Sequence, residues 1–92
     1  MTTYLLFGKY SHDSIKKISA KRTNDAASLI KANGGELKAG YAMLGEHDLL
    51  LIVDFPTTEQ ALKTSVALAK MLEISFSTSP AVDMEVFDKL VV

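Results

Sequence analysis

The sequence contains no cysteine, so neither a disulfide framework nor thiolate chemistry is open to this chain. It also lacks any apolar run that approaches the roughly 20 residues of a membrane-spanning helix. Its first residues show no basic region followed by a long apolar one, which is the pattern of a signal peptide. From these absences we expect a cytoplasmic protein that has no membrane partner.

A strong excess of charge of either sign is absent as well, because the net charge is −1 at pH 7. The charges are nevertheless uneven: residues 9–38 carry seven Lys and Arg against three Asp and Glu, and the remainder carries three against eight. A basic stripe of this kind can bind nucleic acid. From Lys16 to Lys38, however, no aromatic residue interleaves with the basic ones, so we interpret the stripe as a solvated surface and predict no nucleic-acid partner.

What the sequence does contain is a regular succession of strand and helix patterns, in a length that suits one domain over residues 1–92. Apolar segments bounded by turn residues predict four strands, at residues 4–10, 36–44, 48–55 and 74–82. Helical spacing predicts one helix between residues 15 and 33, a second from the Thr57 cap to Leu72, and a short turn after Asp83. The order is β-α-β-β-α-β, the ferredoxin-like pattern.

The predicted fold is α+β, and right-handed crossovers favour an antiparallel sheet of order 4-1-3-2 with both helices on one face. The strand at 48–55 is apolar on both faces. Its odd-numbered residues are expected to face the helices, whereas Leu50 and Ile52 share the other face with Leu6. An open apolar sheet face usually marks an interaction surface. We therefore predict that two copies pack these faces together as a dimeric α/β barrel, and that Tyr41 packs beneath a helix.

Three segments carry a family resemblance. They are Tyr-Leu-Leu-Phe-Gly-Lys-Tyr-Ser at residues 4–11, Gly-Gly-Glu-Leu-Lys-Ala-Gly-Tyr at 34–41, and Leu-Gly-Glu-His-Asp at 44–48. Together they resemble the GYD domain family of small bacterial and archaeal proteins. The resemblance implies the dimeric α/β-barrel superfamily and does not imply an activity. A tyrosine often precedes the aspartate of the turn in that family. Here His47 takes its place, so a role that needs a phenol at that point does not carry over.

The predicted topology brings the loop that holds His12 and the turn that holds His47 and Asp48 to one end of the sheet. Imidazole and carboxylate side chains suit proton transfer and also zinc or iron. These three residues are therefore the catalytic candidates. The alternative is that they are polar only because turns face solvent. Their spacing matches no metal motif, so we predict neither a metal nor a cofactor.

Arg22 is unusual because it falls in the middle of the apolar face if the helix from 15 to 33 is continuous. Three accounts are open. A break near Ser19 and Ala20 would change the helix phase and expose the side chain. Alternatively, the guanidinium pairs with an Asp or Glu across an oligomer interface. In the third account it faces a pocket and binds an anion, which makes Arg22 a ligand-binding candidate.

A further candidate is a cavity on the open sheet face. Gly8 and Gly40 remove side-chain bulk there, and the alternation of side chains assigns four polar residues to the same face: Tyr4, Tyr10, Asp48 and Asp54. An apolar cavity with a few polar groups at its border is the usual design of a small-molecule site. The alternative is that the two glycines let a partner sheet approach closely.

Two functions remain open from the sequence. The first is an oligomer that binds a small ligand or acts as a structural or regulatory module. The second is a small cofactor-free enzyme with oxygenase-like or isomerase-like acid/base chemistry, in which His47 or His12 is the base and Asp48 orients it. No nucleophile–base set and no phosphate-binding loop can be read from the sequence, which favours the first.

Overall fold

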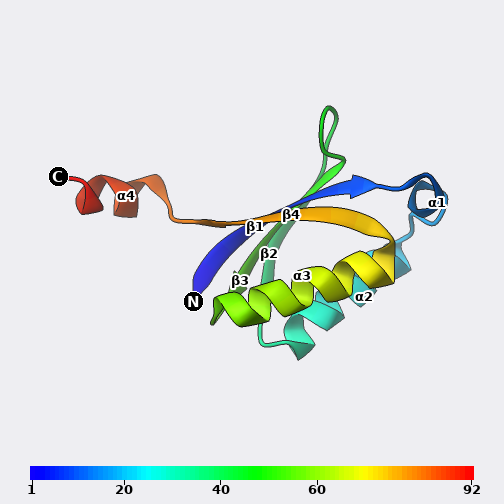
Figure 1. Cartoon of the computed structure of the whole chain (residues 1–92), viewed down its shortest axis with the longest axis horizontal. Helices are drawn as coiled ribbons and strands as arrows, with labels where there is room; N and C mark the ends of the chain where they lie inside the picture. The colour runs from blue at the N-terminus through cyan, green and yellow to red at the C-terminus, as the bar shows by residue number, and fades with distance from the viewer.

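The computed structural model describes residues 1–92 as a four-stranded sheet with helices packed against it (Figure 1). The strands are β1 (Thr2–Tyr10), β2 (Glu36–Ala42), β3 (Leu49–Phe55) and β4 (Ile74–Ala81). The helices are α1 (His12–Ile15), α2 (Ala20–Ala32), α3 (Thr58–Leu72) and α4 (Met84–Leu90). None of the helices is both long enough and apolar enough to cross a membrane.

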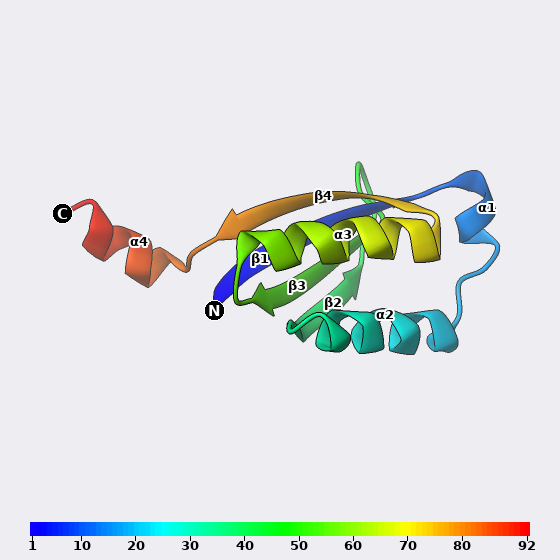
Figure 2. The ribbon, with the colours of Figure 1, turned by 60° about the horizontal axis from the view of Figure 1, so that its bottom comes forward.

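The strands lie in the order β2-β3-β1-β4, which is 4-1-3-2 when read from the β4 edge, and every neighbouring pair is antiparallel. Helices α2 and α3 pack on the same face of this sheet (Figure 2). The α+β class and the ferredoxin-like order of elements predicted from the sequence are confirmed. The Ser- and Thr-rich strand β4 is at an edge of the sheet.

Side-chain caps set the helix boundaries. The Ser19 Oγ accepts a hydrogen bond from the Arg22 N–H at 3.2 Å and starts α2, and the Thr57 Oγ1 accepts from the Gln60 N–H at 3.2 Å and starts α3. Gly34 ends α2 at a φ of +84°, in the left-handed region that favours glycine. The chain therefore does break at Ser19, and the continuous helix from 15 to 33 is absent.

The core lies between the sheet and the pair α2 and α3. Its fully buried side chains include Leu6 of β1, Val53 and Phe55 of β3, Ile30 of α2 and Leu68 of α3. These residues come from both halves of the chain. The two β-α halves therefore depend on each other for burial of their apolar surface.

The face assigned to β1 from the sequence was wrong. Tyr4 pairs with Val53, Leu6 with Leu51 and Gly8 with Leu49, so all three β1 residues point toward the helices. Tyr10 follows the same alternation. The reason is that β1, like β3, is apolar on both faces, so alternation alone does not determine its register. At Gly8 a Cβ atom would lie 2.8 Å from Leu49 Cγ, so the glycine makes room for a core leucine, not for a cavity on the open face.

Strand β2 also departs from the expected alternation. A register shift between Leu37 and Ala39 inserts one extra residue, a β-bulge, and reverses the faces of the residues that follow. Tyr41 consequently lies opposite Leu50 on the open face, where it is 58% exposed, and does not pack beneath a helix. Gly40 lies on the helix face, opposite Leu51.

Candidate functional site

The open face of the sheet is largely apolar. Its centre is formed by Leu5 and Phe7 of β1, Leu50 and Ile52 of β3, and Ala39 and Tyr41 of β2. Ser75, Ser77 and Ser79 of β4 line one edge. At the other edge the Lys38 ammonium lies 3.7 Å from the Glu36 carboxylate and 4.0 Å from that of Asp54. An apolar centre with a polar border is the usual composition of a protein interface.

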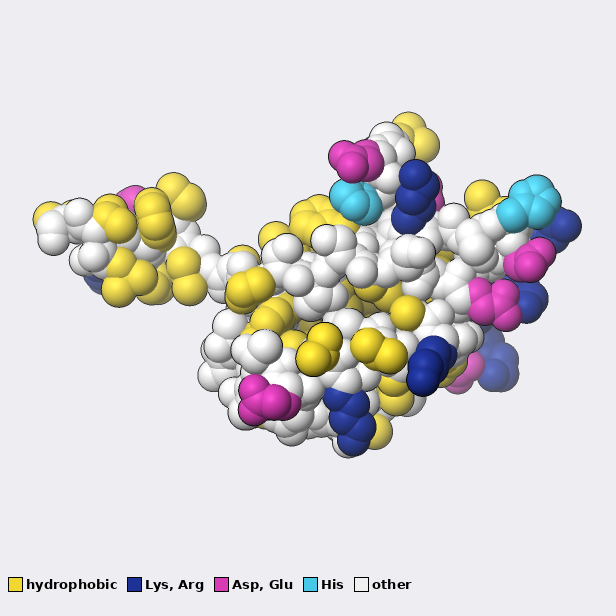
Figure 3. Space-filling model, viewed as in Figure 1, with side chains coloured by type: hydrophobic (Ala, Val, Ile, Leu, Met, Phe, Trp, Pro, Cys, Tyr) yellow, Lys and Arg dark blue, Asp and Glu magenta, His cyan; other side chains and the backbone are white.

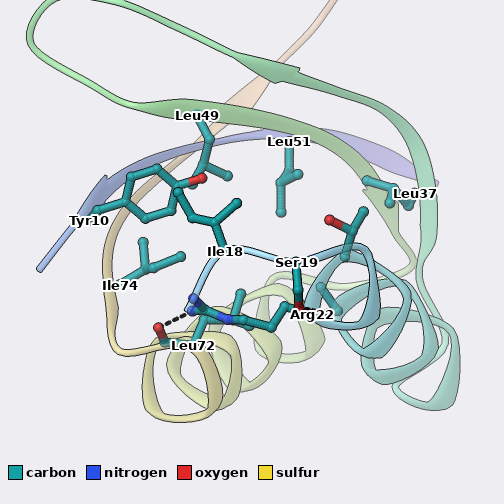
Figure 4. Close-up of a pocket in the computed structure, with 11 residues that line it drawn as sticks. Tyr10, Ile18, Ser19, Arg22, Leu37, Leu49, Leu51, Leu72 and Ile74 are labelled. Carbon is teal, nitrogen blue, oxygen red and sulfur yellow. Dashed lines mark hydrogen bonds between the residues drawn. The ribbon is translucent and has the colours of Figure 1, made fainter. Parts of the chain in front are cut away.

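A separate cavity lies on the other side of the sheet, between β3 and the start of α2 (Figure 4). Its volume is about 90 Å³ and most of its walls are apolar. The lining includes Leu49 and Leu51 from the sheet, Ile74 from β4, and Ile18 from the segment before α2. Cavities near 150 Å³ take up benzene, so this one suits only a smaller group.

Arg22 forms the polar wall of this cavity, and its guanidinium binds the ends of two other helices. It donates one hydrogen bond to the Ser14 carbonyl, at 2.8 Å, and another to the Leu72 carbonyl. These carbonyls belong to the last turns of α1 and α3, where helix carbonyls lack intrahelical donors and carry partial negative charge. Arg22 therefore connects α1, α2 and α3.

None of the three accounts of Arg22 describes this arrangement fully. The helix does break at Ser19, yet the side chain is half-buried and not exposed. Its partners are backbone carbonyls of its own chain, not a carboxylate. A guanidinium has five N–H donors, so the two bonds leave donors that can also serve a ligand at the cavity wall.

The candidate catalytic residues do not form one constellation. The Asp48 carboxylate accepts a hydrogen bond from the Tyr10 N–H at 2.8 Å, and the Asp48 N–H donates to the Gly8 carbonyl at 2.8 Å. Asp48 thus ties the β2–β3 turn to the end of β1. The His47 ring packs against Phe7, with 5.1 Å between ring centroids, at the border of the open face.

His12 lies exposed on α1, and the histidine side chains form two separate patches in Figure 3. Neither His12 nor His47 lines the Arg22 cavity. No group of three or more His, Asp and Glu side chains is arranged to hold a metal ion. At this end of the sheet Asp48 is therefore hydrogen-bonded to Tyr10, but the two histidines do not contact each other.

Replacing Asp48 with alanine is expected to lower the free energy of unfolding by about 2 kcal/mol, because the partly buried Tyr10 N–H loses its charged acceptor. Denaturant titration followed by circular dichroism measures this loss. His47→Ala in the same turn is the control, with an expected change below about 1 kcal/mol because only one ring contact is removed. Equal losses of stability in the two variants would contradict the role of Asp48 in tying the β2–β3 turn to the end of β1.

The four ligand-binding candidates divide between three places. Arg22 and Tyr10 share the cavity. Tyr4 is 3% exposed, its hydroxyl lies 2.9 Å from Thr58 Oγ1, and its ring packs edge-on against the core. Asp54 lies on the open face and accepts a hydrogen bond from the Thr3 hydroxyl at 2.7 Å. Only the first two are close enough to act on one ligand.

Sequence reasoning missed most of the cavity wall. Ile18, Leu37, Leu49, Leu72 and Ile74 all line it. Apolar residues at strand and helix spacing look the same whether they fill a core or line a cavity. The sequence holds no signal that separates the two cases.

The family described as GYD domain matches the chain over residues 4–91. No curated protein matches the sequence. Two similar solved structures are the Mycobacterium tuberculosis leucine response regulatory protein LrpA, with a TM-score of 0.59 and 7% identity, and an AsnC family transcriptional regulator from Agrobacterium tumefaciens, with 0.60 and 19%. Each match covers 90% of this chain and 51% of the other, so the chain spans about half the length of these structures. At these identities the likeness shows the fold alone.

Proposed function

The chain belongs to the GYD domain family, and we propose that it is a self-associating module that binds a small ligand and has a regulatory or structural role. The single observation that carries this proposal is the open apolar sheet face, because an uncovered face of this kind is costly in water. The fold shared with a leucine response regulator and an AsnC family transcriptional regulator supports a regulatory role.

Self-association is proposed to place the open faces of two sheets against each other, as in a dimeric α/β barrel. The central side chains of β1 and β3 would then be buried, and the charged border with Lys38 and Asp54 would remain at the rim. Sheets that pack face to face interdigitate apolar side chains in this way. The serine row on β4 supplies a polar margin on the other side.

The Arg22 cavity is the proposed ligand site. Its apolar walls suit a short hydrocarbon group, and the guanidinium suits an anion at the wall. A small monocarboxylate combines the two features. Ser19 and Thr23 add hydroxyl groups to the lining.

The enzymatic alternative has weaker support. A general base must come within hydrogen-bond reach of the substrate. His12 is exposed, His47 packs on Phe7, and neither lines the Arg22 cavity. The Asp48 carboxylate, which was the proposed orienting group, already accepts from the Tyr10 N–H.

The ligand site is tested with Thr23→Trp, because Thr23 is an exposed residue of α2 that lines the cavity. The indole is expected to block the cavity and to weaken binding of short monocarboxylates at least tenfold, with little change in stability. Calorimetric titration with acetate, propionate and butyrate measures the affinity, and Thr23→Ser is the matched control. If the unmodified protein binds none of these acids at millimolar concentration, the carboxylate assignment is wrong.

A further inference from the structure

The C-terminal helix α4 projects away from the rest of the chain with its apolar side exposed (Figures 1 and 3). At 100° per residue, Met84, Val86, Phe87, Leu90 and Val91 share an arc of about 160°. The polar residues occupy the opposite side. No residue of α4 is buried, and Leu90 is 71% exposed. This is an amphipathic helix whose apolar face has no partner within the chain.

Helix α4 is also too short to be stable by itself. It has seven residues, whereas isolated helices below roughly 12–15 residues are marginal in water. Asp83 caps it, since its carboxylate accepts from the Val86 N–H at 2.9 Å, and Glu85 pairs with Lys89 at 3.8 Å. Such local bonds contribute little on their own. A docked state is therefore needed to hold the helix.

A surface of matching character lies on α3. Leu62 is 65% exposed and Val66 is 47% exposed, and they are one helical turn apart. Both line a groove of about 370 Å³ between α3 and β4, together with Phe76 and Pro80. A helix laid in an apolar groove is a common mode of peptide recognition.

The charges beside the two surfaces are complementary. Lys63 and Lys70 lie next to Leu62 and Val66 on the outer side of α3, together with one carboxylate, that of Glu59. The segment of residues 83–92 carries three acidic residues and one lysine. With two lysines against one glutamate, the border of the groove has a net positive charge, and the acidic segment that holds α4 has a net negative one, so opposite charges orient the encounter.

We propose that α4 of one copy docks in the groove between α3 and β4 of a second copy of this chain. The occupant is a second copy because α4 does not turn back toward the groove of its own chain, although only Val82 and Asp83 join it to β4. In both ribbon views α4 continues beyond the end of β4 and away from α3 (Figures 1 and 2). Reciprocal exchange of the two helices gives a closed, symmetric dimer. The inference rests on the proposed self-association.

Cross-linking tests this contact directly, because the chain has no cysteine of its own. Lys63→Cys and Asp88→Cys are prepared separately, mixed, and treated with a short bismaleimide. The expected result is a mixed cross-linked dimer in at least tenfold higher yield than from Ala20→Cys mixed with Asp88→Cys. Ala20 starts α2 at the opposite end of the molecule from α4 (Figure 2).

Two results would overturn the proposal. One is a mixed-dimer yield no higher than that of the control pair. The other is a link at monomer mass in the double variant Lys63→Cys/Asp88→Cys, which means that α4 folds back on its own chain. Sedimentation of the unmodified protein tells these failures from a failure of the proposed self-association. If the protein is a dimer but no cross-link forms, only the α4 contact is refuted. If the protein is a monomer, the proposed self-association is refuted as well.

A second test measures the strength of the dimer instead of a cross-link. Phe87→Asp is expected to raise the dimer dissociation constant at least tenfold, because a charge enters the apolar arc of α4. Ala20→Asp adds the same charge at the far end and is expected to leave the constant within twofold. An unchanged constant for Phe87→Asp would exclude the docking.

Discussion

Replacing Ile52 with lysine is expected to weaken self-association at least about 100-fold and to leave the fold intact. Ile52 lies at the centre of the open sheet face, paired with Leu5 on one side and Ala39 on the other. Burial of an isoleucine side chain contributes about 1.5–3 kcal/mol, and a symmetric dimer loses that contribution twice. A loss of about 3 kcal/mol is already more than a factor of 100 in the dissociation constant. In the single subunit the lysine side chain reaches solvent, so folding is little affected.

Analytical ultracentrifugation over a range of concentrations measures the dissociation constant, and circular dichroism reports the fold. Ala32→Lys is the matched control, because Ala32 is exposed at the end of α2 on the other side of the sheet. The control is expected to associate like the unmodified protein. Retention of full association by Ile52→Lys would show that the open face is not the interface.

Replacing Arg22 with methionine is expected to lower the free energy of unfolding by about 2–3 kcal/mol and the melting temperature by roughly 10 °C or more. The change removes the side-chain donor to two carbonyls at the ends of two helices, that of Leu72 and that of Ser14, which also accepts from the Lys17 N–H. Methionine keeps much of the apolar stem, so the loss reports on the guanidinium. Because both partners belong to the same chain, the dimer dissociation constant is expected to stay within a few-fold.

Arg22→Lys is the informative companion. It keeps the positive charge, but one ammonium lacks the planar fork that reaches both carbonyls, so we expect about half of the loss. Thermal melts and denaturant titration measure stability, and sedimentation measures assembly. A methionine variant as stable as the parent would mean that the guanidinium is solvated. A dissociated but equally stable variant would mean that its partner is in another subunit.

Much of the fold was predictable because its signals are local. Thr57 and Asp83 cap helices by contacts with residues only three positions away, and Gly34 ends α2 through its own backbone conformation. The alternation of β-favouring segments with helical periodicity then gives the order of elements. The apolar character of β3 on both faces indicated that one face of the sheet has no cover.

The faces of β1 and β2 were less predictable. Leu6 and Tyr4 were assigned to the open face, because a strand that is apolar on both sides gives no preference for either register. Tyr41 was assigned to the helix face, because no residue type in β2 marks the bulge near Lys38. One inserted residue reverses every later side chain of a strand.

The candidate site was predictable only in part. Arg22 stood out as a cation on an apolar face, and it does line a cavity with Tyr10. Its partners are the carbonyls of Ser14 and of Leu72, the second of which is 50 residues away in the sequence, and a backbone carbonyl has no signature that a sequence can show. The histidines were chemically suggestive, but their separation follows from how α1 and the β2–β3 turn leave the sheet.

By itself, therefore, the sequence determined the order of the strands and main helices, the end of α2 and the start of α3, and that apolar surface exceeds what one layer of helices covers. These properties depend on residues within a few positions of each other. The sequence left open the break that separates α1 from α2. The tertiary structure alone decided the register of β1 on β3, the bulge in β2, the helix ends bound by Arg22 and the projection of α4. Those features depend on contacts between residues that are distant along the chain, for which local pattern and composition provide no preference.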